Sequence, residues 1–261
     1  MFSSACEKPV CGLILLVRSG SSRLPKKSLI KISDEPIVFH QIVRLKQTSS
    51  NLPFILATTQ KMEDVVLCTI ADRCGIKSFQ GHTDDVIIRL IQVADYYHLN
   101  FLIVVGGDDV FCEPKFVDNI VEQRKLQNWD FITMTNVPFG TSPFGVSVTG
   151  LKKIIKIRKN DNTDGWERYF TDTGLFRTLT IKNDDQSLAY PEIRLDLDYE
   201  EDLVLIKAIF SRLYKLGSVI DLKEVLELLC DKEPQLQSIN MEAHRKWAQN
   251  KKENWPPIQF D

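Results

Sequence analysis

The sequence lacks the features that mark several large classes of protein. Its formal net charge is only −2 over 261 residues, which gives no overall attraction to nucleic acid or to anionic membranes. The apolar run at residues 13–17 is far too short to cross a bilayer, and no long apolar segment follows a basic start as in a secretory signal. No internal repeat or low-complexity linker divides the chain. We therefore expect one globular unit located in the cytoplasm.

Metal-binding cysteine pairs and covalent catalytic motifs are also missing. The six cysteines show no CxxC spacing, and Cys6 and Cys11 have no second pair or histidine cluster beside them, so we predict no zinc site. Cys68 and Cys74 fall in a helical pattern and at its end, where buried, reduced thiols are expected. The four histidines lie near no nucleophile motif, and covalent catalysis is therefore not expected.

The two common phosphate-binding motifs, GxGxxG and GxxxxGK followed by Ser or Thr, are absent as well. In their place, residues 13–27 read LILLVRSGSSRLPKK. The apolar residues 13–17 predict a strand buried on both faces, and the small residues 19–22 let backbone N–H groups approach an anion. Four cations follow the strand: Arg18, Arg23, Lys26 and Lys27. The stretch alone fits a polyphosphate cradle and an ordinary basic surface loop equally well.

Strand and helix patterns alternate along the chain. Buried strands are predicted at residues 54–58 and 101–105, with amphipathic helices between and after them. Further predicted elements are an extended piece at 29–32, a helix that starts at Ser33 or Asp34, has Pro36 in its first turn and runs to about Thr48, helices at about 65–71, 84–98, 113–127, 200–214 and 221–230, and strands at 130–134 and 176–181. Ser33 or Asp34, and Thr83 or Asp84, are the predicted helix caps, and residues 138–150 are predicted to form a loop. The alternation predicts an α/β fold with a mostly parallel, doubly wound sheet.

Carboxylates follow the most apolar predicted strand. Residues 101–105 end in Gly106-Gly107-Asp108-Asp109; a carboxylate at that end of a central strand suits a metal ligand, although the same residues also suit a turn. The alternation in Arg194-Leu195-Asp196-Leu197-Asp198 predicts that both aspartates face one side. Acidic groups repel a nearby phosphate unless a divalent cation lies between them. The basic loop and the acidic strand ends together predict a Mg²⁺–nucleoside triphosphate site and transfer at phosphorus.

Several segments, taken together, resemble a known family. In chain order they are RSGSSRLPKK, GHTDDVIIR, VVGGDDVFCEPKFVD, RLDLDYEEDLVLIKAI and SINMEAHRKW. They resemble the motifs of sugar cytidylyltransferases, in particular the spore-coat polysaccharide branch, which is related to the synthetases of CMP-activated ulosonic acids such as CMP-Kdo and CMP-sialic acid. The resemblance extends over residues 13 to about 246.

The resemblance implies a single GT-A-like (Rossmann-like) domain that uses CTP and Mg²⁺. A sugar hydroxyl would attack the α-phosphorus of CTP and release pyrophosphate, with Arg18, Arg23 and Lys27 on the triphosphate. Asp108 and Asp198 would hold Mg²⁺. The remaining nucleotide-binding positions implied by the resemblance are Val17, Gly20, Ser21, Ser22, Asp85, Arg89 and Gly107. The expected partners are thus CTP and a sugar acceptor, without nucleic acid or membrane.

Other expectations concern organisation and the acceptor. We expect a nucleotidyltransferase domain over residues 1–218, with a nucleotide half at about 12–136 and an acceptor half at about 137–218, and a helical extension at 219–261. A homodimer is expected by analogy with the family, with the 138–150 segment as a contact. Val110 and Glu200 replace two prolines that are usual in the branch. The aromatic cluster at 166–170 fits the core better than a sugar-stacking surface.

Two alternative functions follow from the same residues. Asp196-Leu197-Asp198 matches the DxD metal motif of GT-A glycosyltransferases, which use a nucleotide-sugar donor, although it lies late in the chain. A non-catalytic relative that only binds nucleotide is the other alternative. The identity of the released product separates the three functions.

Overall fold

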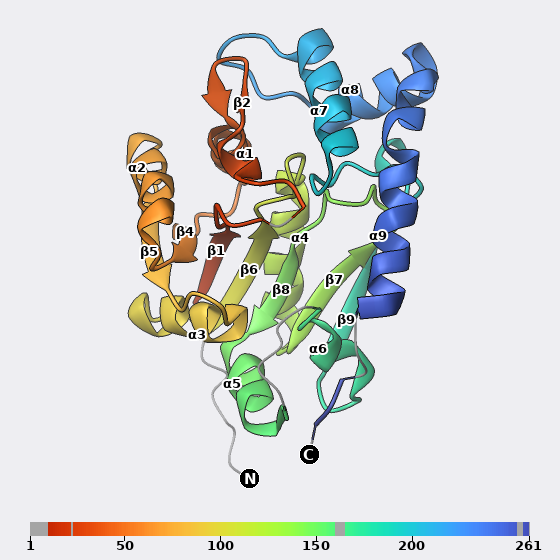
Figure 1. Ribbon diagram of the computed structural model, residues 1–261. Coiled ribbons are helices and arrows are strands. Elements are labelled where there is room, and N and C mark those ends of the chain that lie inside the picture. Colours follow the sequence, from red (N-terminus) through yellow and green to blue (C-terminus); the bar gives the residue numbers. More distant parts are fainter. Residues whose placement is uncertain (1–9, 22, 160–164, 255–257, 261) are drawn as a thin grey trace.

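The computed structural model describes residues 10–21, 23–159, 165–254 and 258–260. A seven-stranded sheet forms its centre (Figure 1). In spatial order the strands are β5 (Lys77–Gly81), β4 (Phe54–Thr59), β1 (Cys11–Leu16), β6 (Phe101–Gly106), β8 (Phe144–Ser147), β7 (Phe131–Thr135) and β9 (Thr178–Lys182). Neighbouring strands are parallel except at β8, which is antiparallel to both β6 and β7. The predicted α/β fold with a mostly parallel sheet is confirmed.

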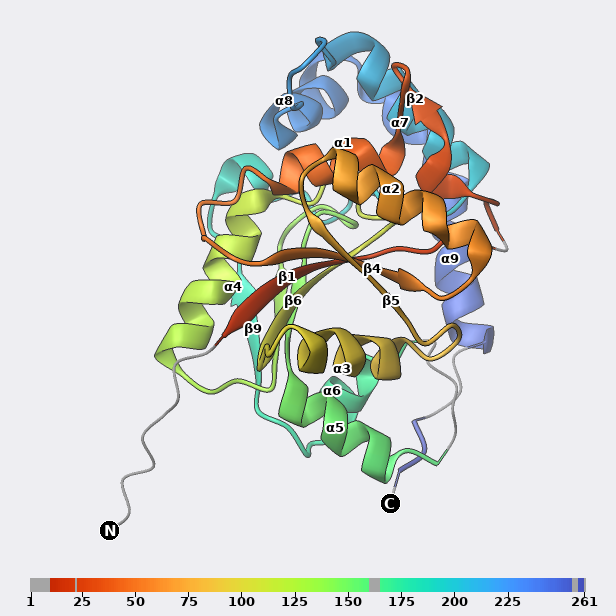
Figure 2. The ribbon, with the colours of Figure 1, turned by 90° about the vertical axis from the view of Figure 1, so that its left-hand side faces the viewer.

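Helices cover both faces of this sheet. They are α1 (Ile37–Leu45), α2 (Val65–Arg73), α3 (Val86–Tyr96), α4 (Pro114–Leu126), α5 (Val148–Ile157), α6 (Arg168–Asp172), α7 (Glu200–Leu213), α8 (Leu222–Glu227) and α9 (Met241–Asn254). Short helical turns are η1 (Lys27–Leu29), η2 (Met62–Asp64), η3 (Gln186–Leu188), η4 (Leu228–Lys232) and η5 (Pro234–Asn240). Figure 2 shows α1 and α2 on one face and α3, α5 and α6 on the other, with α7 and α8 stacked outside α1.

The alternation of side chains along β1 explains why its sequence is continuously apolar. Leu13 and Leu15 enter the core with α1, α2 and α4, whereas Ile14 enters the core with α3, α5 and α6. All three side chains are completely buried, and each contributes about 1.5–3 kcal/mol to folding by its removal from water. A strand covered on both faces has no solvent-facing positions for polar residues. A third apolar cluster joins α7, α8 and η5 to the end of the sheet.

The predicted start of the first helix is wrong. Ser33 and Asp34 have φ angles of 50° and 70°, and they form the turn of a small antiparallel hairpin between β2 (Lys31–Ile32) and β3 (Glu35–Pro36). Two consecutive positive φ angles are typical of a tight hairpin turn, for which Asp is a favourable residue. The helix α1 begins after Pro36 without a side-chain cap. Ser and Asp favour helix caps and turns alike, and in this chain Ser33 and Asp34 form a turn.

The predicted loop at 138–150 is also wrong in part. Residues Phe144–Ser147 form β8, in the middle of the sheet, and α5 begins directly after it with Ser147 as its cap. The strand is only four residues long and follows Pro143, so its apolar pattern is too short to be recognised. Phe139 and Phe144 both pack against aromatic rings of the same chain. β5 was not predicted, because its residues are mostly half-buried or exposed at the sheet edge.

The aromatic cluster near residue 166 belongs to the core, as expected. Trp166, Tyr169 and Phe170 are at most 4% exposed, and the Phe170 ring stacks on Phe131 with centroids 5.0 Å apart. Cys68 and Cys74 are only half-buried, in contrast to the prediction of buried thiols, and Cys6 lies outside the described residues. No helix in the described ranges is long and apolar enough for a membrane crossing.

One charged side chain fixes the connection between α1 and β4. Asp118 on α4 accepts hydrogen bonds from Thr48 Oγ1 at 2.6 Å, from Ser49 N at 3.0 Å and from Ser50 N at 2.8 Å. Partial burial alone would raise the pKa of Asp118, but the donors at residues 48–50 outweigh it and lower the pKa to about 2. The ionised carboxylate therefore stabilises the folded state.

We expect Asp118→Ala to lower the free energy of unfolding by about 1–2 kcal/mol at pH 7, because four donors of residues 48–50 lose a charged acceptor. The folded pKa lies below the unfolded value of about 3.9, so this contribution is complete above that value and declines as the pH falls from about 5 to 2. Urea unfolding at pH 7 and pH 3 measures both effects, with Glu122→Ala, four residues later on the exposed side of α4, as the control. A pH-independent difference between wild type and variant would contradict the assignment.

Candidate functional site

The basic loop after β1 and the acidic turn after β6 lie side by side. The N–H of Gly107 donates to the carbonyl of Leu16 at 2.9 Å. A Cβ on Gly107 would lie 2.8 Å from Cγ2 of Val17, so only glycine permits this close approach. The N–H of Leu197 donates to the carbonyl of Asp108 at 3.1 Å, which brings the third predicted segment to the same place. The structure thus unites the three strand-end segments that the sequence singled out.

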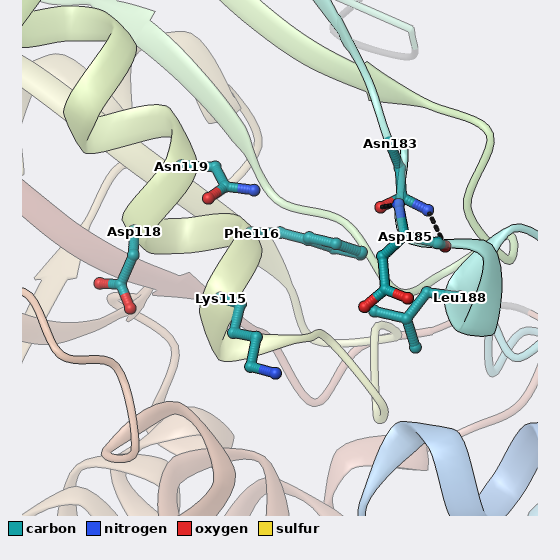
Figure 3. Close-up of a pocket in the computed structure, with 7 residues that line it drawn as sticks. All are labelled: Lys115, Phe116, Asp118, Asn119, Asn183, Asp185 and Leu188. Atoms are coloured by element: carbon teal, nitrogen blue, oxygen red, sulfur yellow. Dashed lines mark hydrogen bonds between the residues drawn. The ribbon is translucent and has the colours of Figure 1, made fainter.

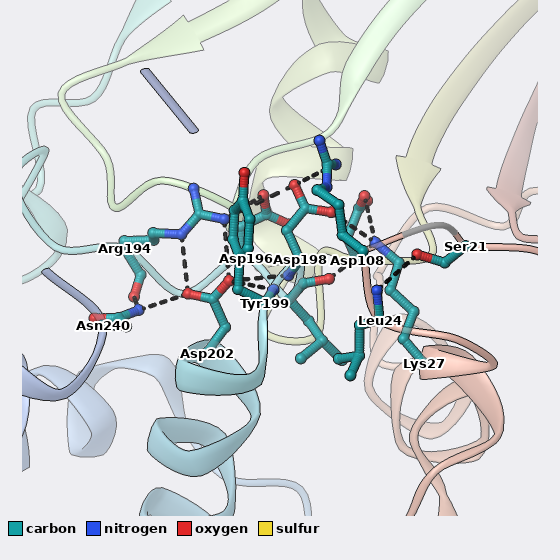
Figure 4. Close-up of polar contacts among 12 residues, drawn as sticks. Ser21, Leu24, Lys27, Asp108, Arg194, Asp196, Asp198, Tyr199, Asp202 and Asn240 are labelled. Carbon is teal, nitrogen blue, oxygen red and sulfur yellow. Dashed lines mark hydrogen bonds and ion pairs between the residues drawn. The ribbon is translucent and has the colours of Figure 1, made fainter. Parts of the chain in front are cut away.

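Lys27 is the central cation of this site (Figure 4). Its Nζ lies 3.0 Å from Asp108 Oδ2, 3.0 Å from Asp198 Oδ1 and 2.8 Å from the carbonyl of Leu197. Burial alone would lower the pKa of Lys27, but Asp108 and Asp198 outweigh it and the pKa is raised. Lys27 therefore bridges the two carboxylates that were predicted to hold a metal ion.

Arg23 provides a second cation at the same carboxylate. Its guanidinium lies 2.7 Å from Asp198 Oδ2 and 5.5 Å from the ring centroid of Tyr199. Burial would raise the pKa of Asp198, yet Lys27 and Arg23 lower it below its ordinary value. About two fifths of the Arg23 side chain is exposed, so an incoming anion can reach it. Arg18 and Gly20 are exposed, and Ser21 is half-buried with its Oγ accepting from the N–H of Leu24 at 3.3 Å.

A group of carboxylates stands beside Lys27. Asp108, Asp109 and Asp196 each place one oxygen within 4.8 Å of the others. Loss of solvation, followed by the charge of Asp108, raises the pKa of Asp109 and of Asp196 well above the ordinary value. Asp196 Oδ1 is buried and accepts no hydrogen bond from the described residues. Oxygen donors with an unsatisfied buried member fit a hard divalent cation. Asp109 is thus a candidate ligand that the sequence did not indicate, and Asp196 of the DxD pattern is another, beside the predicted Asp108 and Asp198.

Asp85 and Arg89 make their contacts within the chain. Asp85 is the cap of α3, accepting from the N–H of Ile88 at 2.9 Å, and it pairs with Arg158 at 2.6 Å. The predicted caps Thr83 and Asp84 are therefore corrected to Asp85. Arg89 is 1% exposed and donates to the carbonyls of His82 and Thr83 at 2.8 and 2.7 Å. Burial and then the charge of Arg18 lower the pKa of Arg89 to about 10.

A cavity of about 220 Å³ lies elsewhere, at the start of α4 and at η3 (Figure 3). It is lined by Lys115, Phe116, Asp118, Asn119, Asn183, Asp185 and Leu188. None of these residues belongs to the cluster around Lys27. Because perturbed, convergent charges indicate chemistry better than volume does, we take the cluster around Lys27, Asp108 and Asp198 as the candidate site. Ser22 lies outside the described residues.

Comparison with known proteins identifies the family to which the chain belongs. A family model described as Cytidylyltransferase matches residues 13–201, a range that includes Lys27, Asp108 and Asp198. The chain belongs to the cytidylyltransferase family. It is a nucleotidyltransferase.

Relatives and solved structures support the family assignment of this cytidylyltransferase. The spore coat polysaccharide biosynthesis protein SpsF of Bacillus subtilis is 25% identical over 76% of this chain and 85% of its own length, and an uncharacterised protein of Methanocaldococcus jannaschii is 26% identical over 89% and 95%. A cytidylyltransferase structure from Leptospira borgpetersenii has a TM-score of 0.78 at 22% identity, covering 87% of this chain and 96% of that one. The structure of a CMP:2-keto-3-deoxy-manno-octonic acid synthetase with CTP has a TM-score of 0.60 at 15% identity, covering 77% and 98%.

The acidic segment of the cytidylyltransferase is held by residues that sequence reasoning did not assign. Asp202 is completely buried and accepts from the N–H groups of Asp198 and Tyr199, each at 3.0 Å. Its carboxylate also receives Nε of Arg194 at 3.0 Å. Gly140, with a φ of 83°, lies so close to the backbone of Asp196 that a Cβ would be 2.6 Å away. The motif RLDLDYEED contains both Arg194 and Asp202. The motif was therefore recognised in the sequence, but the supporting role of these two residues was not predicted.

A second unassigned carboxylate fixes the basic loop. Asp64, at the start of α2, is completely buried. Its Oδ1 accepts from Ser19 N at 2.8 Å and from Ser19 Oγ at 2.5 Å, and its Oδ2 accepts from Thr59 Oγ1. Burial would raise the pKa of Asp64, but the hydroxyls of Ser19 and Thr59 lower it. The first residue of the Ser/Gly loop is thereby tied to the end of β4, which preorganises the cations that follow.

We expect Asp64→Asn to lower the free energy of unfolding by about 1–3 kcal/mol, because an amide nitrogen replaces a buried acceptor oxygen. The loop should also open locally, so that the amide of Ser19 exchanges with solvent faster in hydrogen-exchange measurements. Asp72→Asn on the exposed face of α2 makes the same charge change and serves as the control. Unchanged protection of Ser19 in the Asp64 variant would refute the anchoring role.

Proposed function

We propose that the protein transfers CMP from CTP to a hydroxyl of a sugar, with release of pyrophosphate and with Mg²⁺ as cofactor. The observation that carries this proposal is the contact of Lys27 and Arg23 with Asp108 and Asp198, which sets phosphate-binding cations against oxygen ligands. The proposed acceptor is an acidic sugar of the ulosonic class. The CTP-bound synthetase among the structural neighbours acts on such a sugar, and the Bacillus relative is named for polysaccharide biosynthesis.

The residues of the site have distinct proposed roles. Arg18, Arg23 and Lys27 neutralise and orient the triphosphate, and Gly20, Ser21 and Ser22 supply backbone and hydroxyl donors. Asp108 and Asp198, with Asp109 and Asp196 beside them, would hold Mg²⁺, which offsets the charge that develops on the leaving pyrophosphate when bound. Val17 and Gly107 contact each other and form the base of the nucleotide site. Asp85 and Arg89 shape the nearby 82–85 turn.

The wider organisation follows the same scheme. Residues 12–136, which include β1, β6 and the basic loop, form the nucleotide half, and residues 137–218 contribute the acceptor side. Residues 219–254 form a helical extension that contains α8 and α9, and the active form is a homodimer. Water must be kept from the α-phosphorus until the sugar hydroxyl lies in line with it.

A nucleotide panel tests base and metal together. We expect CTP with Mg²⁺ to raise the melting temperature more than UTP, ATP or GTP, and to do so much less without the metal. At a concentration 100 times the dissociation constant, the stabilisation is about 2.7 kcal/mol. Preference for a purine nucleotide would overturn the cytidylyl assignment. Product analysis then separates the alternatives: pyrophosphate indicates nucleotidyl transfer, nucleoside diphosphate from a nucleotide-sugar indicates glycosyl transfer, and binding without turnover indicates a non-catalytic protein.

We expect Asp108→Ala to abolish pyrophosphate release from CTP and Mg²⁺ in the presence of ulosonic acids, without loss of the fold. Arg23→Ala should retain turnover but raise the KM for CTP about 10- to 150-fold, since a lost charge-assisted contact costs about 1.5–3 kcal/mol. Lys26→Ala removes an exposed cation of the same loop and is the control. Steady-state assays of released pyrophosphate measure these effects. Undiminished release by the Asp108 variant would remove this residue from the metal site.

A further inference from the structure

The helix α9 and the residue before it contact the segment that carries Asp196 and Asp198. Figure 1 shows α9, in blue, running past β7. Asn240, directly before α9, donates its side-chain amide to the carbonyl of Arg194 at 3.1 Å and to Asp202 Oδ1 at 2.9 Å. The rings of His244 and Trp247 stack on each other with centroids 6.0 Å apart. Trp247 also lies 4.6 Å from the ring of Phe139. The C-terminal segment is therefore continuous with the candidate site.

Arg194 connects this segment to the site. Its side chain is 2% exposed, and its single charge is shared by three aspartates. Nη2 lies 3.3 Å from Asp196 Oδ2, 3.1 Å from Asp202 Oδ2 and 3.8 Å from Asp198 Oδ2. The desolvation of Arg194 is thus compensated by the acidic segment on one side, as a buried guanidinium requires.

Aromatic rings surround the same guanidinium. The carbon Cζ of Arg194 lies 5.2 Å from the ring centroid of Phe139, 5.9 Å from that of Tyr199 and 5.9 Å from that of Trp247. Stacking of a guanidinium on aromatic faces is attractive and strengthens as water is excluded. The rings also restrict the rotamers of Arg194. Whatever restrains Arg194 also helps to restrain Asp196 and Asp198, because Arg194 forms ion pairs with both.

We propose that Trp247 is a positioning residue of the active site: it holds Arg194 against Asp196 and Asp198 and so keeps these carboxylates in place for the metal–nucleotide complex. This inference rests on the proposed function. It assigns a catalytic contribution to a C-terminal helix that lies beyond the 13–201 range of the family model. Trp247 touches Arg194 and not the reacting atoms, so its effect is indirect.

The experiment compares Trp247→Ala, Trp247→Phe and the control Arg245→Ala, which removes an exposed cation that pairs with Glu242 on α9 itself. Calorimetric titration gives the affinity for CTP with and without Mn²⁺. We expect the alanine variant to bind CTP about 3- to 10-fold more weakly with Mn²⁺, the loss expected for one cation–π contact. Metal-free binding should be unchanged, and phenylalanine should restore most of the loss. Should the alanine variant not fold, Trp247→Leu, which keeps apolar contact but has no ring, should show the same loss.

Hydrogen exchange at the backbone amides of Asp198 and Tyr199 provides a measure that needs no ligand. Both amides donate to the carboxylate of Asp202, which Arg194 also contacts. Faster exchange in Trp247→Ala and not in Arg245→Ala supports the inference. Equal exchange together with equal CTP–Mn²⁺ affinity in wild type and Trp247→Ala would overturn it. If the wild type shows no Mn²⁺-dependent CTP binding while Trp247→Ala still accelerates exchange, the proposed function fails and the positioning of the carboxylates stands.

Discussion

The structure depends on the balance of charge where β1 and β6 end. Asp108, Asp109, Asp196 and Asp198 gather there, and like charges a few ångströms apart in a poorly solvated site repel strongly unless cations lie between them. Lys27, Arg23 and Arg194 supply those cations. The sheet brings the segments together, but it is the pairing of opposite charges that makes their contact tolerable.

The same charge pairs determine how the proposed substrate would bind. Lys27 and Arg23 are each bound to a carboxylate, so a triphosphate must compete with Asp198 for them. If the phosphates take these cations, the carboxylates lose their compensation, and a divalent cation that arrives with the nucleotide restores it. Under the proposed function, the binding of the metal and the binding of the nucleotide would therefore be coupled by electrostatics. Asp64 and Asp202 have different roles, because their oxygens are saturated by donors from the chain and hold the basic loop and the acidic segment in position.

The parts of this picture that could be predicted from sequence are those with a strong local signal. Residues 13–17 and 101–105 are apolar without interruption because both faces of their strands are covered, and Asp108 follows glycines at the end of such a strand. Ser33 and Asp34 were misread because the same side chains favour helix caps and hairpin turns, and β8 was missed because four residues carry too little periodicity. Asp64 could not be recognised as an anchor, since Ser19 and Thr59 are brought near it by the fold. The partners of Asp202 include the nearby Arg194, but the sequence does not show that this carboxylate is buried among them.

The C-terminal helix α9 is another part of the site whose role could not be predicted from the sequence. Its polar, Lys-rich sequence gives a weak apolar pattern, yet Trp247 and Asn240 contact a buried arginine that is far away along the chain. A buried guanidinium facing three carboxylates needs both neutralisation and enclosure, and the RLDLDYEED segment supplies the first and, through Tyr199, only part of the second. The rest of the enclosure comes from Phe139 and from Trp247 on α9. The electrostatic arrangement of the site therefore extends to Trp247 on α9, beyond the residues that carry the charges.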